Sequence, residues 1–222
     1  MCGRFTLTAE TEQLQESFPQ VSFPPQSGPR FNIAPTQPVL AVPNTPALAA
    51  DYFTWGLVPS WAKDPEIGSR LINARAETLG EKPSFRGSYK YKRCLVFTDG
   101  FYEWQAQPGS KSKVPHFIRL ETGKPFAFAG LWDEWHSPDG SQIKSCTIIT
   151  TEPNTLMAKL HNRMPVILPE SAYAQWLDPA PRKPEELQTL LVPYPAAAMT
   201  AYPVSTLVNS PANDRAECIV PA

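Results

Sequence analysis

Residues 94–105 read Cys-Leu-Val-Phe-Thr-Asp-Gly-Phe-Tyr-Glu-Trp-Gln, two apolar segments separated by Asp99 and Gly100. An Asp-Gly pair between apolar segments is typical of a tight turn, so we expect a β-hairpin at this point. In the second segment a period of two places Glu103 on the same face as Phe101, with aromatic residues on the opposite face. Because a carboxylate among aromatic side chains must be paired or shift toward its protonated form, Glu103 is a candidate proton carrier. A buried structural ion pair is the alternative for the same residue.

The rest of the chain is expected to form short strands and short helices. Hydrophobic patterns predict further strands at 3–8, 38–43, 52–58, 114–120, 126–132 and 145–151, and closing strands after Tyr202. Helices are expected at about 9–18 with Thr8 as the N-cap, and at 153–159, 170–176 and 183–191. The chain holds 26 prolines in 222 residues, more than twice the usual level of about 5%. Proline at this density predicts many ordered loops, with the polar stretches 19–30 and 106–113 among them.

Length, charge and cysteine spacing restrict the class of protein. A chain of 222 residues suits one large domain or two small ones. The formal net charge of −1 gives no support for nucleic-acid binding by overall charge, so such binding would need a local patch. The four cysteines, at positions 2, 94, 146 and 218, form no C-x-x-C pair and no metal-binding spacing, which fits a reducing compartment. No signal-peptide pattern and no apolar run of membrane-spanning length occurs, so we expect a cytoplasmic protein. The histidines likewise show no metal-binding spacing, so no metal is expected.

A basic stretch lies within this nearly neutral chain. Residues 68–93 hold seven basic side chains against Glu77 and Glu81, a local balance of +5. The basic residues are Arg70, Arg75, Lys82, Arg86, Lys90, Lys92 and Arg93. Aromatic residues at 85, 89 and 91 interleave with them, as the groove of a protein that binds single-stranded nucleic acid would require. A solvated basic loop explains the charge equally well, so the charge alone leaves both interpretations open.

The second residue of the chain has distinctive chemistry. Removal of Met1 would leave Cys2 at the N-terminus, where its α-amine and its thiol are both partly nucleophilic near neutral pH. The amine can attack an aldehyde to form an imine, and the thiol can then close on the same carbon to form a thiazolidine ring. The same residue could instead attack an amide as an N-terminal nucleophile, with its own amine as the base. A cysteine that only packs in the interior is the third interpretation.

Three further residues stand out by their surroundings. His161 is expected at a helix-to-strand junction next to Asn162 and Arg163, a setting that suits a general acid–base better than a core position. Asn73 interrupts an apolar segment with a side chain able to form several hydrogen bonds. Trp61 lies on a proline-fixed loop, where it is either a plug for the core or a stacking platform for a base, with the plug as the default interpretation.

Six short motifs occur together in one order along the chain. They are Cys2-Gly3-Arg4-Phe5, Arg30-Phe31-Asn32-Ile33-Ala34-Pro35, Trp55-Gly56-Leu57, Ile72–Thr78, Asp99–Trp104 and His161-Asn162-Arg163-Met164-Pro165. In this combination the chain resembles the SRAP family, the SOS-response-associated peptidase-like proteins, also called abasic-site processing proteins. The resemblance is strongest over residues 2–209. It implies one α+β domain over residues 1–222, with a β-barrel-like core, short peripheral helices and a positively charged cleft.

The resemblance also implies a function and assigns roles to residues. Members of the family bind single-stranded DNA and trap abasic sites as a covalent thiazolidine through the N-terminal cysteine, here Cys2. Asn73 would hold the terminal amine and the sugar, Glu103 would move protons during imine formation and ring closure, and His161 would assist opening of the deoxyribose ring. The residues expected to contact DNA are Arg4, Asn32, Pro35, Trp61, Arg75, Lys82, Arg86 and Arg163. The resemblance implies no cofactor and no metal. It implies protection of the lesion in the DNA damage response, with weak lyase activity as a side reaction.

Two other functions remain open, and a monomer is expected in each case. The first is a cysteine peptidase or amidase that uses Cys2 with the histidine and a polar side chain named above, including self-cleavage of a short leader. The second is a binding module for single-stranded DNA in which Cys2 has no covalent role. One position departs from the family pattern, because the second aromatic residue of the Trp61 loop is here Ala62. This departure puts a base-wedging role of that loop in question.

Overall fold

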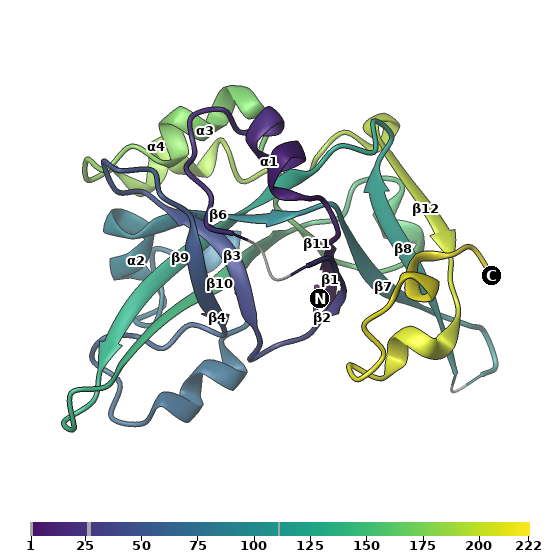
Figure 1. Ribbon diagram of the computed structural model, residues 1–222, viewed down its shortest axis with the longest axis horizontal. Coiled ribbons are helices and arrows are strands. Elements are labelled where there is room, and N and C mark those ends of the chain that lie inside the picture. Colours follow the sequence, from purple (N-terminus) through teal and green to yellow (C-terminus); the bar gives the residue numbers. More distant parts are fainter. Residues whose placement is uncertain (1, 26–27, 111) are drawn as a thin grey trace.

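The computed structural model describes residues 2–25, 28–110 and 112–222, and the strands of these residues form two sheets (Figure 1). The first sheet has the strand order β12-β8-β7-β1-β2. Its strands are β1 (Phe5–Leu7), β2 (Arg30–Ile33), β7 (Gly100–Ala106), β8 (Lys113–Leu120) and β12 (Met199–Pro203). The predicted loops 19–30 and 106–113 include residues 26, 27 and 111, which lie outside the described residues.

Five strands of the second sheet close into a barrel. They are β3 (Pro38–Pro43), β4 (Asp51–Trp55), β6 (Arg93–Thr98), β9 (Phe126–His136) and β10 (Gln142–Thr151). β10 pairs in parallel with β4 and antiparallel with β9, β3 joins β4 to β6, and β6 joins β9, so the hydrogen-bonded ring returns to its start. β11 (Met164–Pro165) and β5 (Asn73–Arg75) attach to β10 outside the ring. The expected α+β class with a β-barrel-like core is confirmed.

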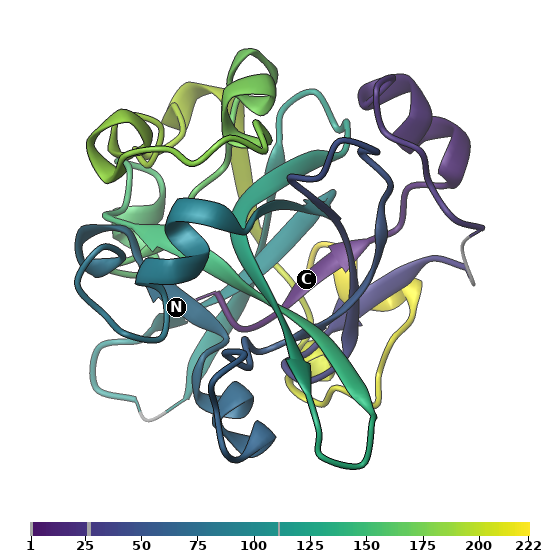
Figure 2. The ribbon, with the colours of Figure 1, turned by 90° about the vertical axis from the view of Figure 1, so that its left-hand side faces the viewer.

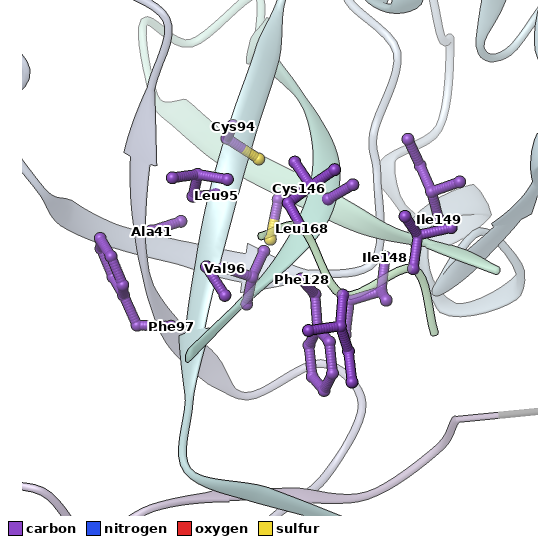
Figure 3. Close-up of a cluster of buried hydrophobic side chains, with 14 of the residues drawn as sticks. Ala41, Cys94, Leu95, Val96, Phe97, Phe128, Cys146, Ile148, Ile149 and Leu168 are labelled. Atoms are coloured by element: carbon purple, nitrogen blue, oxygen red, sulfur yellow. The ribbon is translucent and has the colours of Figure 1, made fainter. Parts of the chain in front are cut away.

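The barrel encloses the main hydrophobic core. All residues of β6 are buried, which is why its middle, Cys94–Phe97, is apolar without alternation. Its Leu95 belongs to the same cluster as Phe128 of β9 and Ile148 of β10 (Figure 3). Phe5 of β1 reaches this core too, where its ring centre lies 5.8 Å from that of Phe128 in an edge-on contact. Aromatic packing therefore anchors the chain three residues after Cys2.

The expected hairpin at Asp99 and Gly100 is wrong. β6 and β7 follow each other in the chain, but β6 belongs to the barrel and β7 to the other sheet. The Asp99 carboxylate accepts hydrogen bonds from the N-terminal segment, namely from the backbone N–H of Thr8 (2.5 Å) and from the hydroxyls of Thr6 and Thr8. Gly100 is required here because a Cβ would lie 2.1 Å from the ring of Phe117. The chain thus crosses from one sheet to the other, and β1 pairs with β7.

Short helices lie at the periphery of the sheets (Figure 2). They are α1 (Thr11–Ser17), α2 (Arg86–Tyr91), α3 (Glu170–Trp176) and α4 (Pro184–Gln188), with 3₁₀ turns at η1 (Pro65–Arg70), η2 (Ala76–Thr78), η3 (Met157–Lys159), η4 (Ala196–Ala198), η5 (Thr206–Asn209) and η6 (Ala216–Ile219). α3 occupies the predicted range, whereas the helices expected at 183–191 and 153–159 shorten to α4 and η3. No helix of the described residues is both long and apolar enough to cross a membrane.

Two local predictions near the chain ends are wrong, because contacts with distant parts of the chain override the local sequence pattern. Thr8 is not the N-cap of α1, because its hydroxyl bonds to Asp99 and Glu10 takes the cap position. Beyond β12, most of the segment expected to form closing strands is η5 and η6. Val208 of η5 and Cys218 of η6 pack in a second hydrophobic cluster on the first sheet, so their apolar character reflects this cover rather than strands of their own.

Candidate functional site

Cys2, the first residue of the predicted site, is held by Asn73. Cys2 is fully buried, and Met1, whose removal the predicted chemistry requires, lies outside the described residues. Asn73 opens β5, and its Nδ2 donates a 2.7 Å hydrogen bond to the carbonyl oxygen of Cys2. The Oδ1 of Asn73 is buried and has no hydrogen-bond partner among the described residues. Since buried polar atoms are normally paired, this oxygen can accept a donor from a bound ligand.

Glu103 lies beside Cys2 on β7. It is 3% exposed. Phe101 belongs to the main core and Tyr102 to the second cluster, as the predicted alternation requires. Burial raises the pKa of the Glu103 carboxyl. Burial also raises the pKa of the Cys2 thiol, and the nearby negative charge of Glu103 raises it further. The arrangement therefore keeps the thiol protonated and places next to it a carboxyl that can exchange a proton.

His161 is connected to the same strand. The Nε2 of Gln105 on β7 donates to the carbonyl oxygen of Lys159 (2.9 Å), two residues before His161. The Nδ1 of His161 accepts the backbone N–H of Arg163 (3.1 Å), so the proton of the neutral ring lies on Nε2. Burial lowers the pKa of His161, and the positive charge of Lys113 lowers it further. The ring is therefore neutral at physiological pH and can present an N–H group to a ligand.

Arg4 is supported from the interior by Asn32. The Nη1 of Arg4 donates to the Oδ1 of Asn32 (2.8 Å) and to the carbonyl oxygen of Val208 (2.7 Å). Asn32 is fully buried, and its Nδ2 donates to the carbonyl oxygen of Asn213 (2.7 Å). The expectation that Asn32 lines a DNA groove is therefore corrected, because its polar atoms are used inside the protein. Asn32 orients Arg4, whose Nε is buried without a hydrogen-bond partner among the described residues.

Arg163 is fixed by a two-point ion pair. Its Nη1 and Nη2 donate to the two carboxylate oxygens of Glu77 at 2.6 and 2.9 Å, and Nη2 also donates to the carbonyl oxygen of Thr150 (2.7 Å). This contact lowers the pKa of Glu77. Glu77 lies in η2 directly after β5, so Asn73, Arg75 and Glu77 come from one short segment. Arg75 is exposed, whereas the Arg163 side chain is only 15% exposed.

The basic stretch 68–93 divides into structural and exposed members. Arg93 is fully buried and donates to backbone carbonyl oxygens, among them that of Trp176 (2.9 Å). Lys92 forms an ion pair with Asp133 (2.6 Å). The exposed cations are Arg70, Arg75, Lys82, Arg86 and Lys90. The expected patch is therefore smaller than its sequence count, because burial and pairing remove two of its charges.

The aromatic residues of this region also divide by burial. Phe85 and Tyr89 belong to the core, so the interleaved pattern of the sequence does not form a row of exposed rings. Trp61 is 59% exposed and Tyr91 is 50% exposed, and both line a surface pocket of about 180 Å³. The default interpretation of Trp61 as a core plug is wrong. Its neighbour Ala62 is buried instead.

Pro35, another residue expected to contact DNA, is partly exposed in the turn after β2.

The structure thus brings most of the predicted catalytic residues into one region, and it adds residues that the sequence analysis did not select. Glu77 and Lys113 are charged neighbours of the site that no local pattern marked, because their partners lie far away along the chain. No group of His, Cys, Asp and Glu within residues 2–25, 28–110 and 112–222 could hold a metal ion.

Comparison with known proteins defines the class. Residues 1–211 match the family described as SOS response associated peptidase (SRAP), and this chain belongs to that family. It is 48% identical over 222 residues to the abasic site processing protein YoqW of Bacillus subtilis, covering 99% of each chain. It is 46% identical over 222 residues to YoaM of the same organism, covering 99% of this chain and 97% of YoaM. The crystal structure of a Bacteroides thetaiotaomicron protein matches all of both chains with a TM-score of 0.88 at 26% identity. The predicted resemblance is confirmed.

Proposed function

We propose that this protein traps abasic sites in single-stranded DNA as a covalent thiazolidine on Cys2, after removal of Met1. The observation that carries the proposal is the 2.7 Å hydrogen bond from Asn73 to the Cys2 carbonyl, with Glu103 beside the thiol. The relatives YoqW and YoaM, named abasic site processing proteins, support the same substrate for this chain. Trapping would shield the lesion during the DNA damage response.

The proposed reaction forms two bonds at the aldehyde carbon of the ring-opened abasic sugar. The α-amine of Cys2 attacks this carbon, and water leaves to give an imine. The thiol S–H then adds across the C=N bond, so that sulfur bonds to carbon and the proton ends on nitrogen. The product contains the protein and the oligonucleotide less one water. A thiazolidine is more durable than the imine, from which β-elimination would cleave the strand.

Glu103 and His161 are the proposed proton carriers. Because burial raises the pKa of the Cys2 thiol, a base must take its proton as sulfur attacks, and the Glu103 carboxylate is the adjacent base. In its protonated form Glu103 can donate to the hydroxyl that leaves as water during imine formation. The Nε2–H of His161 would bond to the sugar ring oxygen as the ring opens. Asn73 would hold the reacting amine and sugar in place.

The DNA strand is proposed to run past the cations around the Cys2 site and on the basic stretch. The proposed phosphate contacts are Arg4, Arg75, Lys82, Arg86 and Arg163, and the proposed base contacts are Pro35 and Trp61. Phosphate contacts of this kind supply most of the affinity and none of the sequence specificity. Asn32 acts indirectly, by orienting Arg4. For Arg163, a phosphate would compete with Glu77 for the guanidinium group.

A peptidase is the second candidate, because the family description names that activity. The buried Cys2 thiol argues against it, since a thiol peptidase depends on a thiolate and burial raises the pKa of this group. The two functions differ in what Cys2→Ala does. A trapping protein loses the adduct and keeps most of its affinity for single-stranded DNA. A peptidase loses turnover in a manner independent of DNA.

Intact mass spectrometry tests the proposal. The protein is measured before and after incubation with a single-stranded oligonucleotide that carries one abasic site. The expected result is a chain without Met1, then a species equal to protein plus oligonucleotide less one water, stable to heat without borohydride. A matched oligonucleotide with a tetrahydrofuran abasic analogue, which has no aldehyde, serves as the control. A chain that lacks Met1 and forms no adduct with the natural abasic site would refute the trapping mechanism.

A further inference from the structure

Two exposed aromatic side chains line the same surface pocket. Trp61 is 59% exposed and Tyr91 is 50% exposed, more than any other aromatic residue that the structure describes. The pocket lies between the loop of Trp61 and α2, whose last residue is Tyr91. Because large aromatic rings are mostly covered in folded proteins, two of them left open to solvent around one hollow indicate a binding surface.

The wall of the pocket that carries Trp61 is held by hydrogen bonds on both sides of this residue. The backbone N–H of Ser60 donates to the Oδ2 of Asp133 (2.9 Å), and the Nε1 of Trp135 donates to the carbonyl oxygen of Ala62 (2.7 Å). Both partners are buried side chains of β9. The loop is therefore fixed while its indole stays open, so binding costs little ordering of the chain.

The opposite wall is fixed by the same carboxylate. The Oδ1 of Asp133 accepts from the Nζ of Lys92 (2.6 Å), the residue that follows Tyr91. The backbone carbonyl of Tyr91 accepts from the Nδ2 of Asn44 (3.1 Å). Asp133 thus connects the chain next to Trp61 with the chain next to Tyr91. Since both of its oxygens already accept hydrogen bonds, this residue sets the spacing of the two walls rather than offering a site for a cation.

The size of the pocket restricts its ligand. Its volume of about 180 Å³ is below the roughly 300–1,000 Å³ of a site for a drug-sized molecule. Gly87 of α2 lines it, and a Cβ at this position would meet no atom within 4 Å, so no side chain fills the space there. Hydroxyl groups, which can donate and accept, come from Ser60, Ser84 and Ser88. A single flat ring system with polar edges fits this description.

The charge around the pocket adds an anion to this ligand. Residues 82–92 contain four cations, Lys82, Arg86, Lys90 and Lys92, and no acidic residue. The Nζ of Lys90 lies 4.9 Å from the centre of the Tyr91 ring. A ligand whose ring contacts Tyr91 would therefore bring an attached anionic group close to a cation. A flat ring joined to a phosphate is a nucleotide unit.

We propose that the pocket between Trp61 and Tyr91 binds one nucleobase of the single-stranded DNA, turned out of the stack of its neighbours. The cations of residues 82–92 contact the phosphates on either side of that base. The inference rests on the proposed function and deepens it, because it assigns a base-binding site to the strand that carries the lesion. The second ring comes from α2, since the residue after Trp61 in its own loop is the buried Ala62. Stacking of this kind accepts any base, as every base has a π-face.

The test compares the wild-type protein with Tyr91→Ala and Tyr91→Phe by fluorescence anisotropy. Two oligonucleotides of equal length are used. One is a lesion-free single strand, and the other carries tetrahydrofuran at every position, so it keeps the sugar–phosphate backbone and has no bases. Tyr52→Ala is the matched control, because Tyr52 is a tyrosine of β4 that is 39% exposed and lines no part of this pocket.

We expect Tyr91→Ala to weaken binding to the lesion-free strand about 5- to 150-fold, the equivalent of the roughly 1–3 kcal/mol that stacking of one base contributes. Tyr91→Phe keeps the ring and the affinity. All variants bind the baseless strand equally, which also shows that Tyr91→Ala is folded. The slope of log K against log[salt] stays unchanged, because tyrosine carries no charge. A Trp61→Ala/Tyr91→Ala protein loses less than the product of the two single losses, because both rings hold one base.

Several outcomes would overturn the inference. Tyr91→Ala may not match Tyr52→Ala in affinity for the lesion-free strand, and it may not lose as much on the baseless strand as on the strand with bases. Losses that multiply fully in the double variant would mean that each ring binds a different group. A deoxynucleoside monophosphate that binds as tightly as the strand would assign the pocket to free nucleotides instead.

The proposed function and this inference fail separately, because neither oligonucleotide contains an aldehyde. If the natural abasic site forms no adduct while Tyr91→Ala binds the lesion-free strand weakly, trapping is refuted and the base pocket stands. If the adduct forms and Tyr91→Ala binds like Tyr52→Ala, only the pocket is refuted. Where both hold, Tyr91→Ala raises the protein concentration that gives half of the maximal trapping rate and leaves the maximal rate unchanged.

Discussion

Replacement of Asn73 by alanine tests the contact that holds the reactive residue. The change removes the 2.7 Å hydrogen bond to the Cys2 carbonyl. A buried acceptor left without its partner costs about 1–3 kcal/mol, and natural domains are stable by about 5–15 kcal/mol. The variant therefore remains folded, with a melting temperature lower by about 2–4 °C for each kcal/mol lost.

The effect on trapping is expected to be much larger than the effect on stability. A displacement of a reacting group by about 1 Å can slow a reaction by about 100-fold, and Asn73→Ala frees Cys2 on this scale. The variant also loses the buried Oδ1, which has no protein partner among the described residues. Asn73→Asp keeps the size of the side chain but cannot donate to the Cys2 carbonyl, so it is expected to trap as slowly as the alanine variant.

Trapping is measured under single-turnover conditions, with protein in excess over an abasic oligonucleotide and adduct resolved on a denaturing gel. Asn44→Ala is the matched control, because Asn44 is a buried asparagine that donates to the Tyr91 carbonyl (3.1 Å) and accepts from the backbone N–H of Arg93 (2.9 Å). Asn44 also accepts from the Nε1 of Trp132 (3.1 Å), so this control loses at least as much stability as Asn73→Ala at a place remote from Cys2 in the hydrogen-bond network. An Asn73→Ala protein that traps at the rate of Asn44→Ala would refute the positioning role of Asn73.

Three other substitutions separate chemistry, binding and packing. Glu103→Gln is expected to slow trapping and to flatten the loss of stability as pH rises. The raised pKa of this carboxyl makes the native state bind more protons than the unfolded state between about pH 4.3 and the raised pKa itself. Urea titrations at several pH values measure this trend, and an unchanged slope of stability against pH would contradict it. Trp61→Ala is expected to leave the melting temperature unchanged, because the residue is 59% exposed, and to weaken single-strand binding by about 1–3 kcal/mol. Fluorescence anisotropy checks this, and equal affinity would exclude stacking. Gly100→Ala places a Cβ 2.1 Å from the ring of Phe117, so it is expected to lower the free energy of unfolding by about 1–3 kcal/mol; a denaturation midpoint equal to that of the wild type would show that the ring can move away.

Elements with strong local signals were predictable from the sequence. The strand at 38–43 and the helix at 170–176 agree with β3 and α3, because a short apolar run between prolines and a proline before a helical pattern act over a few residues. The Asp-Gly signal at residue 99 failed for the opposite reason. The hydrogen bonds of Asp99 join it to Thr6 and Thr8, more than ninety residues away along the chain, and no local pattern contains that pairing.

In the candidate site, too, local sequence predicted some features and contacts between distant segments decided the others. Lys82 and Arg93 contribute equal charge to the basic stretch, yet one is exposed and the other is fully buried against backbone carbonyl oxygens. Asn32 was expected to line a groove and instead supports Arg4 from the interior. Lys113 carries no sequence signal at all. Burial and partner choice depend on segments brought together by folding, so residue type and spacing could not decide them.

The sequence by itself determined which reactive groups the protein carries and where several of its helices and strands form. An amine and a thiol on one residue, a carboxyl among aromatic rings and a histidine after a helical turn are properties of residue type and near neighbours. Only the tertiary structure decided how these groups act on one another. The barrel and the first sheet bring β5 and β7 to Cys2, so that Asn73 bonds to its carbonyl and the charge of Glu103 acts on its thiol. Electrostatic and hydrogen-bond effects of this kind depend on distance and burial, and neither quantity exists until the chain has folded.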